Sequence, residues 1–245
     1  MNEAVFESVR KGLSYIERSL CRDIGVRDVA DSVSYSQFYF SREFTRYTHQ
    51  SVYDYIVKRK ISESYKRLFR EKIRIADLAF LYGFQSHEVY TRAFKKVFHE
   101  LPSEAVVYKP LAVFEAIGGR YLEFLRALEV EIVHQPCQDC FFVPSKPARR
   151  PDGPLDSLVH LDGENPFRVE QTFQGRLTDG ETNRLSFRLA GLQTVVRIHH
   201  SDISHCFRYF TEHFFNASEL NANYIVLRRA GRAVELLVPT AVQKP

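Results

Sequence analysis

The chain has no run of 18 consecutive apolar residues, so its sequence contains no candidate for a membrane-spanning helix. Only four of its 245 residues are cysteine, too few for a disulfide scaffold, which favours a reducing, cytoplasmic compartment. The first twenty residues carry acids and no apolar core, so we expect no secretory signal. Glycine-rich phosphate loops, Gly-x-Ser-x-Gly and His-Glu-x-x-His are also absent, and we expect neither an enzyme nor a cofactor.

The net charge of +4 is small but unevenly distributed along the chain. Residues 1–109 hold 19 Lys/Arg and 14 Asp/Glu, whereas residues 110–245 hold 15 and 16. A basic first half beside a near-neutral second half suggests that only the first half meets a polyanion. Apolar residues make up 44% of the sequence, which is enough for packed cores in two modest domains.

The first half has the apolar spacing of a helical domain. One stripe at spacings of three and four consists of Val5, Val9, Leu13, Ile16 and Leu20. A second, on the long segment 51–70, consists of Val52, Tyr55, Ile56, Ile61, Tyr65 and Leu68. Shorter helices are predicted at 26–33, 36–48 and 103–108, and a short helix, a turn and a longer helix at 73–98.

The second half contains most of the prolines and shorter periodic segments. "LQTVVRIHH", "NYIVLRR" and "AVELLVP" are β-branched and bounded by turn residues, as is typical of strands. Between them, "DISHCFRYFTEHFF" has helical spacing, so we expect strand–helix–strand–strand at the C-terminus. The predicted organisation is an all-α domain at 1–109, a linker or uncertain segment at 110–128, and an α+β domain at 129–245.

Two stretches of the helical half repeat one another. At an offset of fifty, Ser36, Phe40, Arg42, Phe44 and Arg46 align with Ser86, Tyr90, Arg92, Phe94 and Lys96. Upstream, Ala30 aligns with Ala79 at an offset of forty-nine. A short helix with a small residue, a turn and a capped second helix make a helix-turn-helix. We expect each serine to cap its second helix, and the phenylalanines of the repeat to be buried.

In a helix-turn-helix, the second helix lies in the major groove and its N-terminal residues contact base edges. The predicted base contacts are Gln37, Phe38, Ser41, Arg42, His87, Glu88, Thr91 and Arg92. The predicted phosphate contacts are Ser36, Arg46, Ser86, Lys95 and Lys96. Two such units joined by one long helix could read one asymmetric site as a monomer. The alternative, ordinary amphipathic helices with solvated charges, does not account for the shared cap, arginine and buried aromatic.

Residues 5–108 resemble the DNA-binding domain of the AraC/XylS family. The resemblance is carried by "IADLAFLYGFQSHEVYTRAFKKVFHELPSE" and by "VADSVSYSQFYFSREFTRYTHQSVYDYIVKRKISES". It places Phe38, Ser41, Arg42, His87, Glu88 and Arg92 where family members contact bases. The sequence departs from the pattern at Ser34, where the family usually has a turn glycine, and at His99-Glu100, where a glycine commonly stands. Losing such a glycine costs about 1 kcal/mol.

Residues 129–239 resemble, more faintly, the GyrI-like effector-binding domain that Rob-type family members carry after the DNA-binding domain. The resemblance implies two strand–helix–strand–strand halves around an aromatic pocket for amphiphilic or cationic compounds. The chain between Phe142 and Leu158 is too short and proline-rich for a first-half helix, so the pocket is open, altered or absent. Pocket candidates are Phe141, Tyr209, His213, Tyr224 and Glu235. The alternative is that these residues are ordinary core, with Glu235 on the solvent side of a strand.

The segment "HQPCQDC" contains His134, Cys137 and Cys140. A Cys-x-x-Cys pair can bind zinc or cycle as a dithiol, but structural zinc needs four ligands. No second pair with suitable spacing is present, so we favour reduced thiols and no metal site.

The sequence and the resemblance together predict a transcriptional activator that binds double-stranded DNA and RNA polymerase and responds to a small-molecule effector. It would act as a monomer or a dimer, away from membranes. One alternative keeps DNA binding and makes the C-terminal domain a ligand-free dimerisation or docking module. The other is a small-molecule-binding or hydrolysing domain with a helical interaction arm.

Overall fold

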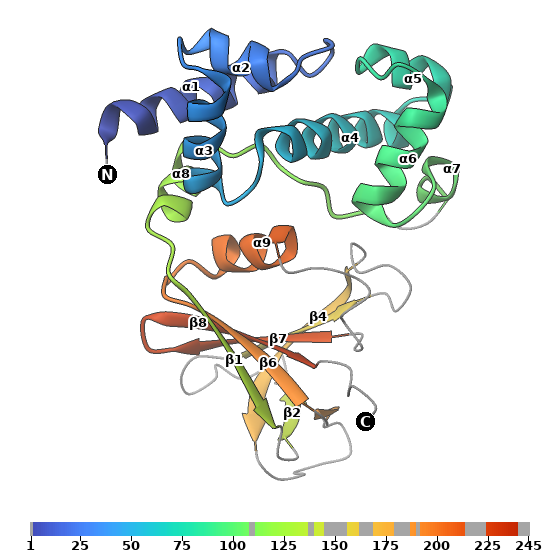
Figure 1. The fold of residues 1–245 in the computed structure, drawn as a ribbon. Coiled ribbons are helices and arrows are strands. Elements are labelled where there is room, and N and C mark those ends of the chain that lie inside the picture. Colours follow the sequence, from blue (N-terminus) through green and yellow to red (C-terminus); the bar gives the residue numbers. More distant parts are fainter. Residues whose placement is uncertain are drawn as a thin grey trace, which may run out of the picture. The chain divides into compact units, whose positions relative to one another are not determined.

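The computed structural model describes residues 2–107, 111–136, 140–144, 156–161, 169–178, 187–189, 192–213 and 224–239. The chain divides into two compact units, Met1–Ala127 and Leu128–Pro245. The first consists of helices and the second of a sheet with the helix α9 (Figure 1). Among the described residues, no helix combines the length and the apolar character needed to cross a membrane.

The helical unit confirms the predicted order of helices up to residue 105 and adds a helix, at Gly119–Arg126, that the sequence interpretation did not predict. Their bounds are α1 (Glu3–Arg18), α2 (Val26–Ser32), α3 (Gln37–Thr48), α4 (Val52–Arg70), α5 (Ile75–Leu81), α6 (His87–Phe98), α7 (Pro102–Ala105) and α8 (Gly119–Arg126). The helix expected at 103–108 is one turn long, and Tyr108 lies outside the described residues.

Serine side chains begin three of these helices. The hydroxyls of Ser36, Ser51 and Ser86 accept hydrogen bonds from the backbone N–H groups of the third helical residues, at 3.3, 3.0 and 3.3 Å. Each hydroxyl thus satisfies a donor that has no partner within its helix. The predicted caps Ser36 and Ser86 are therefore confirmed.

The core of the helical unit contains the residues that the periodicity predicts. The predicted stripe is buried along α1 from Val5 to Ile16, as is Leu20 just after the helix. On α4 all the predicted residues except the half-buried Leu68 are buried. Phe44 and Phe94, the repeated aromatic pair, are both 0% exposed. Large-to-small changes at such positions typically cost about 3–5 kcal/mol, so these rings are central to the stability of each unit.

The helical unit continues beyond residue 109, where the sequence interpretation ended it. Leu111, Phe114 and Ile117 are buried, and α8 adds the buried side chains Tyr121, Leu122, Phe124 and Leu125. The segment expected to be a linker therefore carries part of the core of the first unit, which ends at Ala127.

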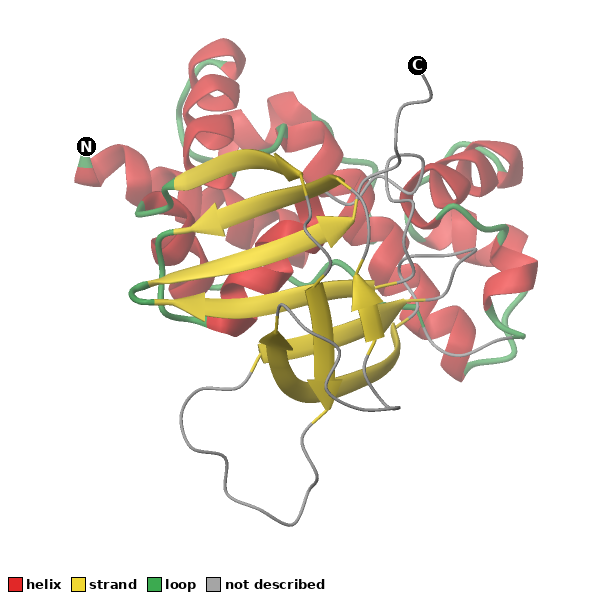
Figure 2. Ribbon diagram, turned by 90° about the horizontal axis from the view of Figure 1, so that it is seen from below, coloured by secondary structure: helices red, strands yellow, loops and turns green. Residues whose placement is uncertain are grey.

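The second unit is built on an eight-stranded sheet of order β1-β6-β8-β7-β3-β4-β2-β5, drawn in yellow in Figure 2. The strands are β1 (Val130–Pro136), β2 (Cys140–Pro144), β3 (Asp156–Leu161), β4 (Val169–Thr178), β5 (Phe187–Leu189), β6 (Leu192–Ile198), β7 (Tyr224–Ala230) and β8 (Ala233–Pro239). All paired strands are antiparallel.

The sheet repeats one pairing pattern. In β6–α9–β7–β8, strand β8 lies between β6 and β7, and α9 spans Ile203–His213. This confirms the predicted strand–helix–strand–strand order. In β2–β3–β4, strand β4 likewise lies between β2 and β3. The two halves meet where β3 pairs with β7. Residues 145–155, between β2 and β3, lie outside the described residues.

Candidate nucleic-acid interface

The helical unit contains two helix-turn-helix units, α2–α3 and α5–α6. Their second helices begin at caps fifty residues apart, and each ends at a left-handed histidine: His49 has φ 58° and His99 has φ 60°. Phe40 and Tyr90 are 1% and 0% exposed and face inward at equivalent positions. The repeat that the sequence predicts is therefore also a repeat of backbone and packing.

The predicted base-contacting side chains lie largely in solvent. Gln37, Phe38, Arg42, His87, Glu88 and Arg92 are exposed, while Ser41 and Thr91 are half-buried. Phe38 is 80% exposed, so a large apolar ring stands in water at the start of α3. Among the predicted phosphate contacts, Ser36, Arg46, Lys95 and Lys96 are exposed and Ser86 is half-buried. An exposed phenylalanine at this position can make an apolar contact with a thymine methyl group.

Glu88, in the first turn of α6, carries a negative charge where a DNA-reading helix would meet bases. A hydrogen bond with the Ser86 side chain and a backbone hydrogen bond lower the pKa of Glu88 below its ordinary value. The helix N-terminus also favours an anion at this position. The ionised carboxylate can only accept hydrogen bonds, which suits the amino group of cytosine.

The two second helices hold their arginines differently. In α3, the carboxylate of Glu43 is buried and lies 3.2 Å from Arg42 Nη2 and 3.6 Å from Arg46 Nη1. The guanidinium of Arg42 also lies 5.3 Å from the centre of the Tyr39 ring. In α6 the residue equivalent to Glu43 is an alanine, and among the described residues Arg92 has no ion pair. The alignment did not identify Glu43, because an acid inside a basic helix has the pattern of a solvated charge.

The turns of the two units differ in what surrounds them. Gly83 has φ 72° and Ser34 has φ 61°, both in the left-handed region. A Cβ on Gly83 would lie 2.8 Å from the backbone oxygen of Arg22, whereas Ser34 is exposed. A side chain at position 34 therefore costs backbone strain alone. A side chain at position 83 would in addition clash with the backbone of Arg22.

In the second unit, Glu235 on β8 is 4% exposed, contrary to the solvent-facing alternative for this residue. Its carboxylate accepts hydrogen bonds from Arg197 Nε on β6 and Arg228 Nε on β7, each at 3.0 Å. Burial opposes its charge, but these hydrogen bonds outweigh that effect and lower the pKa of Glu235 below its usual value. Arg197 Nη1 also donates to Glu131 on β1 at 2.6 Å. The charges alternate in sign across four neighbouring strands.

Two further pocket candidates are side by side on α9. The ring centres of Tyr209 and His213 are 4.3 Å apart, and Tyr209 is 6% exposed. The side chains of Phe141 and Tyr224 lie outside what the structure describes, although both residues are in strands. The structure therefore brings Tyr209 and His213 together without describing a pocket around them.

The Cys-x-x-Cys segment gives no described site. Cys137 lies outside the described residues, as do the side chains of His134 and Cys140. Within the described part of the chain, no group of three His, Cys, Asp or Glu could hold a metal ion.

Comparisons with known proteins match the helical unit. Residues 29–106 match the family model described as a helix-turn-helix domain. PqrA of Proteus vulgaris, a probable transcription factor, is 32% identical over 94 residues, which cover 38% of this chain and 77% of PqrA. YbfP of Bacillus subtilis, an uncharacterised HTH-type transcriptional regulator, is 29% identical over 143 residues, covering 53% of this chain and 48% of YbfP.

The transcriptional regulator Rob of Salmonella typhimurium is 31% identical over 112 residues, covering 46% of this chain and 38% of Rob. The chain therefore spans less than half the length of YbfP and of Rob.

Proposed function

This chain belongs to the AraC/XylS family of helix-turn-helix transcriptional regulators, and on that premise we propose that it activates transcription by binding asymmetric DNA sites with both of its helix-turn-helix units. The observation that carries the proposal is the repeat of α3 and α6. Each helix has a serine cap, a buried aromatic face and exposed polar and basic side chains at equivalent positions. Two second helices on one unit can enter successive major-groove segments about 34 Å apart.

The proposed contacts divide into two kinds. Exposed side chains in the first two turns of α3 and α6, such as Phe38 and Arg92, read base edges. Arg46, Lys95 and Lys96 lie in the last turns of these helices and neutralise phosphates. Phosphate contacts supply salt-dependent affinity for any duplex, whereas base contacts supply preference for one sequence.

Selection of bound duplexes from a random library by the full-length protein, at moderate salt, tests the proposal. We expect one asymmetric motif with two blocks about a helical turn apart. A palindrome would instead indicate a dimer that sets the spacing. If nothing is recovered, the selection is repeated with Met1–Ala127, and failure of this unit as well would contradict DNA reading.

For the second unit, we propose the GyrI-like effector-binding role. The repeated pairing of β6–β8–β7 and β2–β4–β3 supports this fold, since it consists of two similar halves. The pairing of Glu235 with two arginines does not favour a cationic ligand, because both carboxylate oxygens already have partners. An amphiphile that contacts Tyr209 and His213 agrees better with these contacts.

Thermal unfolding of the full-length protein with bile salts, fatty acids and cationic dyes tests this role, because a ligand of the native state raises the melting temperature. A rise with bile salts or fatty acids alone supports an amphiphilic effector. No rise with any compound favours the alternative of a dimerisation or docking module, whose partner could be RNA polymerase. A ligand-induced rise in a protein that binds no duplex would instead favour a small-molecule-binding or hydrolysing domain with a helical arm.

A further inference from the structure

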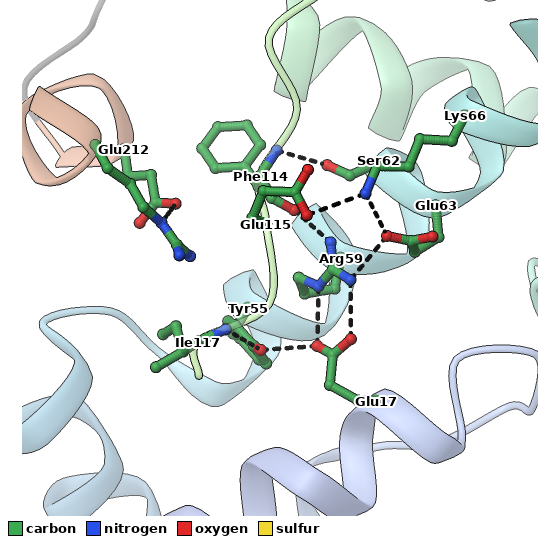
Figure 3. A network of polar contacts seen from close by, with 11 residues as sticks. Glu17, Tyr55, Arg59, Ser62, Glu63, Lys66, Phe114, Glu115, Ile117 and Glu212 are labelled. Carbon is green, nitrogen blue, oxygen red and sulfur yellow. Dashed lines mark hydrogen bonds and ion pairs between the residues drawn. The ribbon is translucent and has the colours of Figure 1, made fainter. Parts of the chain in front are cut away.

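Residues 111–127, here called the strap, run along the linker helix α4 through hydrogen bonds from their backbone. Leu111 N donates to Tyr65 Oη at 3.1 Å. Phe114 N donates to Ser62 Oγ at 3.1 Å, and Ile117 N donates to Tyr55 Oη at 3.2 Å. Three polar side chains of α4 therefore bind three backbone amides of residues 111–117 in order along the helix. Figure 3 shows the contacts of Ser62 and Tyr55.

Arg59 joins the strap to both α1 and α4. Its Nε and Nη2 donate to the two carboxylate oxygens of Glu17, each at 2.9 Å, and Nη2 also donates to Glu63 at 2.9 Å. Nη1 donates to the backbone oxygen of Phe114. The Arg59 side chain is only 4% exposed, so these contacts are made with little competition from water (Figure 3).

The strap contacts both helix-turn-helix units. Near its start, the centre of the Phe114 ring lies 6.2 Å from the centre of the Phe98 ring at the end of α6. Near its end, the backbone oxygen of Leu125 is 3.0 Å from His49 Nε2, directly after α3. Arg126 lies 4.5 Å from the ring centre of Phe6 and pairs with Glu3 at 2.8 Å. One continuous segment therefore connects α6 to α3 and α1 across α4.

A second brace lies elsewhere on α4. Lys60 is 5% exposed, and its Nζ donates to the backbone oxygen of Arg22 at 2.6 Å. The same backbone at Arg22 and Asp23 abuts Gly83 in the turn of the second unit. The loop after α1 thus touches the α5–α6 turn. With this brace and the strap, α4 is held from two sides, and the units do not depend on α4 alone for their relative position.

We propose that the strap sets the spacing between the two DNA half-sites by fixing the separation and rotation of α3 and α6. This rests on the proposed function, because spacing matters only if both units bind one duplex. Inserting one base pair moves the second half-site by about 3.4 Å and rotates it by about 35° around the duplex axis. A braced pair of helices cannot follow that shift, whereas a pair joined by α4 alone can bend toward it.

The test is a spacing profile measured with the full chain. Affinity is determined for the selected site and for sites with one base pair inserted or removed between its blocks. We expect the wild type to lose about tenfold or more on either change. For the variant Phe114→Ala/Ile117→Ala, the affinity for the altered sites should be less than about threefold below its affinity for the selected site, because the anchors of the strap to α6 and α4 are weakened. The single variant Phe114→Leu should keep the wild-type profile, since it leaves a large apolar side chain at position 114.

The matched control is Arg120→Ala, which removes an exposed side chain from the same segment and should leave the profile unchanged. Partial unfolding lowers the affinity for all spacings by the same factor. The ratio of the affinity for the selected site to that for an altered site therefore reports how the helices are positioned and not how stable the variant is. If the double variant does not fold, Ser62→Ala removes a single hydroxyl and is judged by the same ratio.

The inference is overturned if the wild type tolerates the changed spacings, or if Phe114→Ala/Ile117→Ala, or Ser62→Ala in its place, keeps the wild-type ratio. Failure of the proposed function has a different signature, since the wild type would then bind no duplex with sequence preference. That result would overturn both proposals.

Discussion

Replacing Gly83 with serine tests why the turns of the two helix-turn-helix units carry different residues. Gly83 has φ 72°, and a left-handed conformation costs a residue with a Cβ about 1 kcal/mol. A Cβ here would also lie 2.8 Å from the oxygen and 2.9 Å from the carbon of Arg22. These are backbone atoms, and overpacking of this kind costs about 1–3 kcal/mol. The expected loss of stability for Gly83→Ser is therefore about 2–4 kcal/mol.

The reciprocal change, Ser34→Gly, is the matched control. Ser34 has φ 61° but is exposed, so only the backbone strain is relieved. Glycine also gains entropy in the unfolded chain, and the net gain should be at most about 1 kcal/mol. Urea unfolding followed by far-UV circular dichroism measures both, because the chain has no tryptophan and the signal comes mainly from the helical unit. If Gly83→Ser cost no more than about 1 kcal/mol, the contact with Arg22 would not be tight and the reasoning would fail.

Three further changes test the interface and the network around α4. Arg92→Ala should weaken a specific site by about 1–3 kcal/mol and relax preference at one base position, measured by competition among sites that differ at single bases. Lys95→Ala should weaken all sequences alike and lower the salt slope by about one, and equal profiles for both variants would contradict the division of roles. Burial raises the pKa of Glu63, but hydrogen bonds from Lys66 and Arg59 outweigh it and hold that pKa below its ordinary value of 4.5. The ionised Glu63 therefore stabilises the fold above about pH 4.5, and this contribution is lost as the pH falls further. In Glu63→Gln the free energy of unfolding should depend less on pH in that range, as measured by urea unfolding followed by circular dichroism at a series of pH values.

The elements of the helical unit could be predicted because their signals are local. A serine followed by an apolar repeat marks the start of α3 and of α6, and a buried aromatic recurs at Phe44 and Phe94. The repeat also predicted the exposed side chains of both second helices, since equivalent positions of the same motif face the same way. These features depend on residues within one or two turns of each other.

The strap and its partners could not be predicted in this way. Arg59 and Lys60 lie on a helix rich in charges, and a charge on a helix is usually solvated because its burial without partners is costly. Their partners are distant in sequence: Glu17 and Phe114 for Arg59, and Arg22 for Lys60. No local pattern links these residues. The sequence therefore offers no reason to assign residues 110–128 to the helical core, and it predicts a linker there.

Glu235 shows the same limit in the sheet. Its role depends on register, because Arg197 and Arg228 lie directly opposite it on β6 and β7. A shift of one residue in either pairing would turn an arginine to the other face and leave a buried carboxylate without its partner. The sequence places one acid and two arginines on three strands but does not give the order in which those strands pair. Once the order is known, Glu235 is the centre of a neutralised ionic row. A cationic effector would then have to displace a guanidinium to reach it, so an effector that leaves the row intact is the simpler expectation.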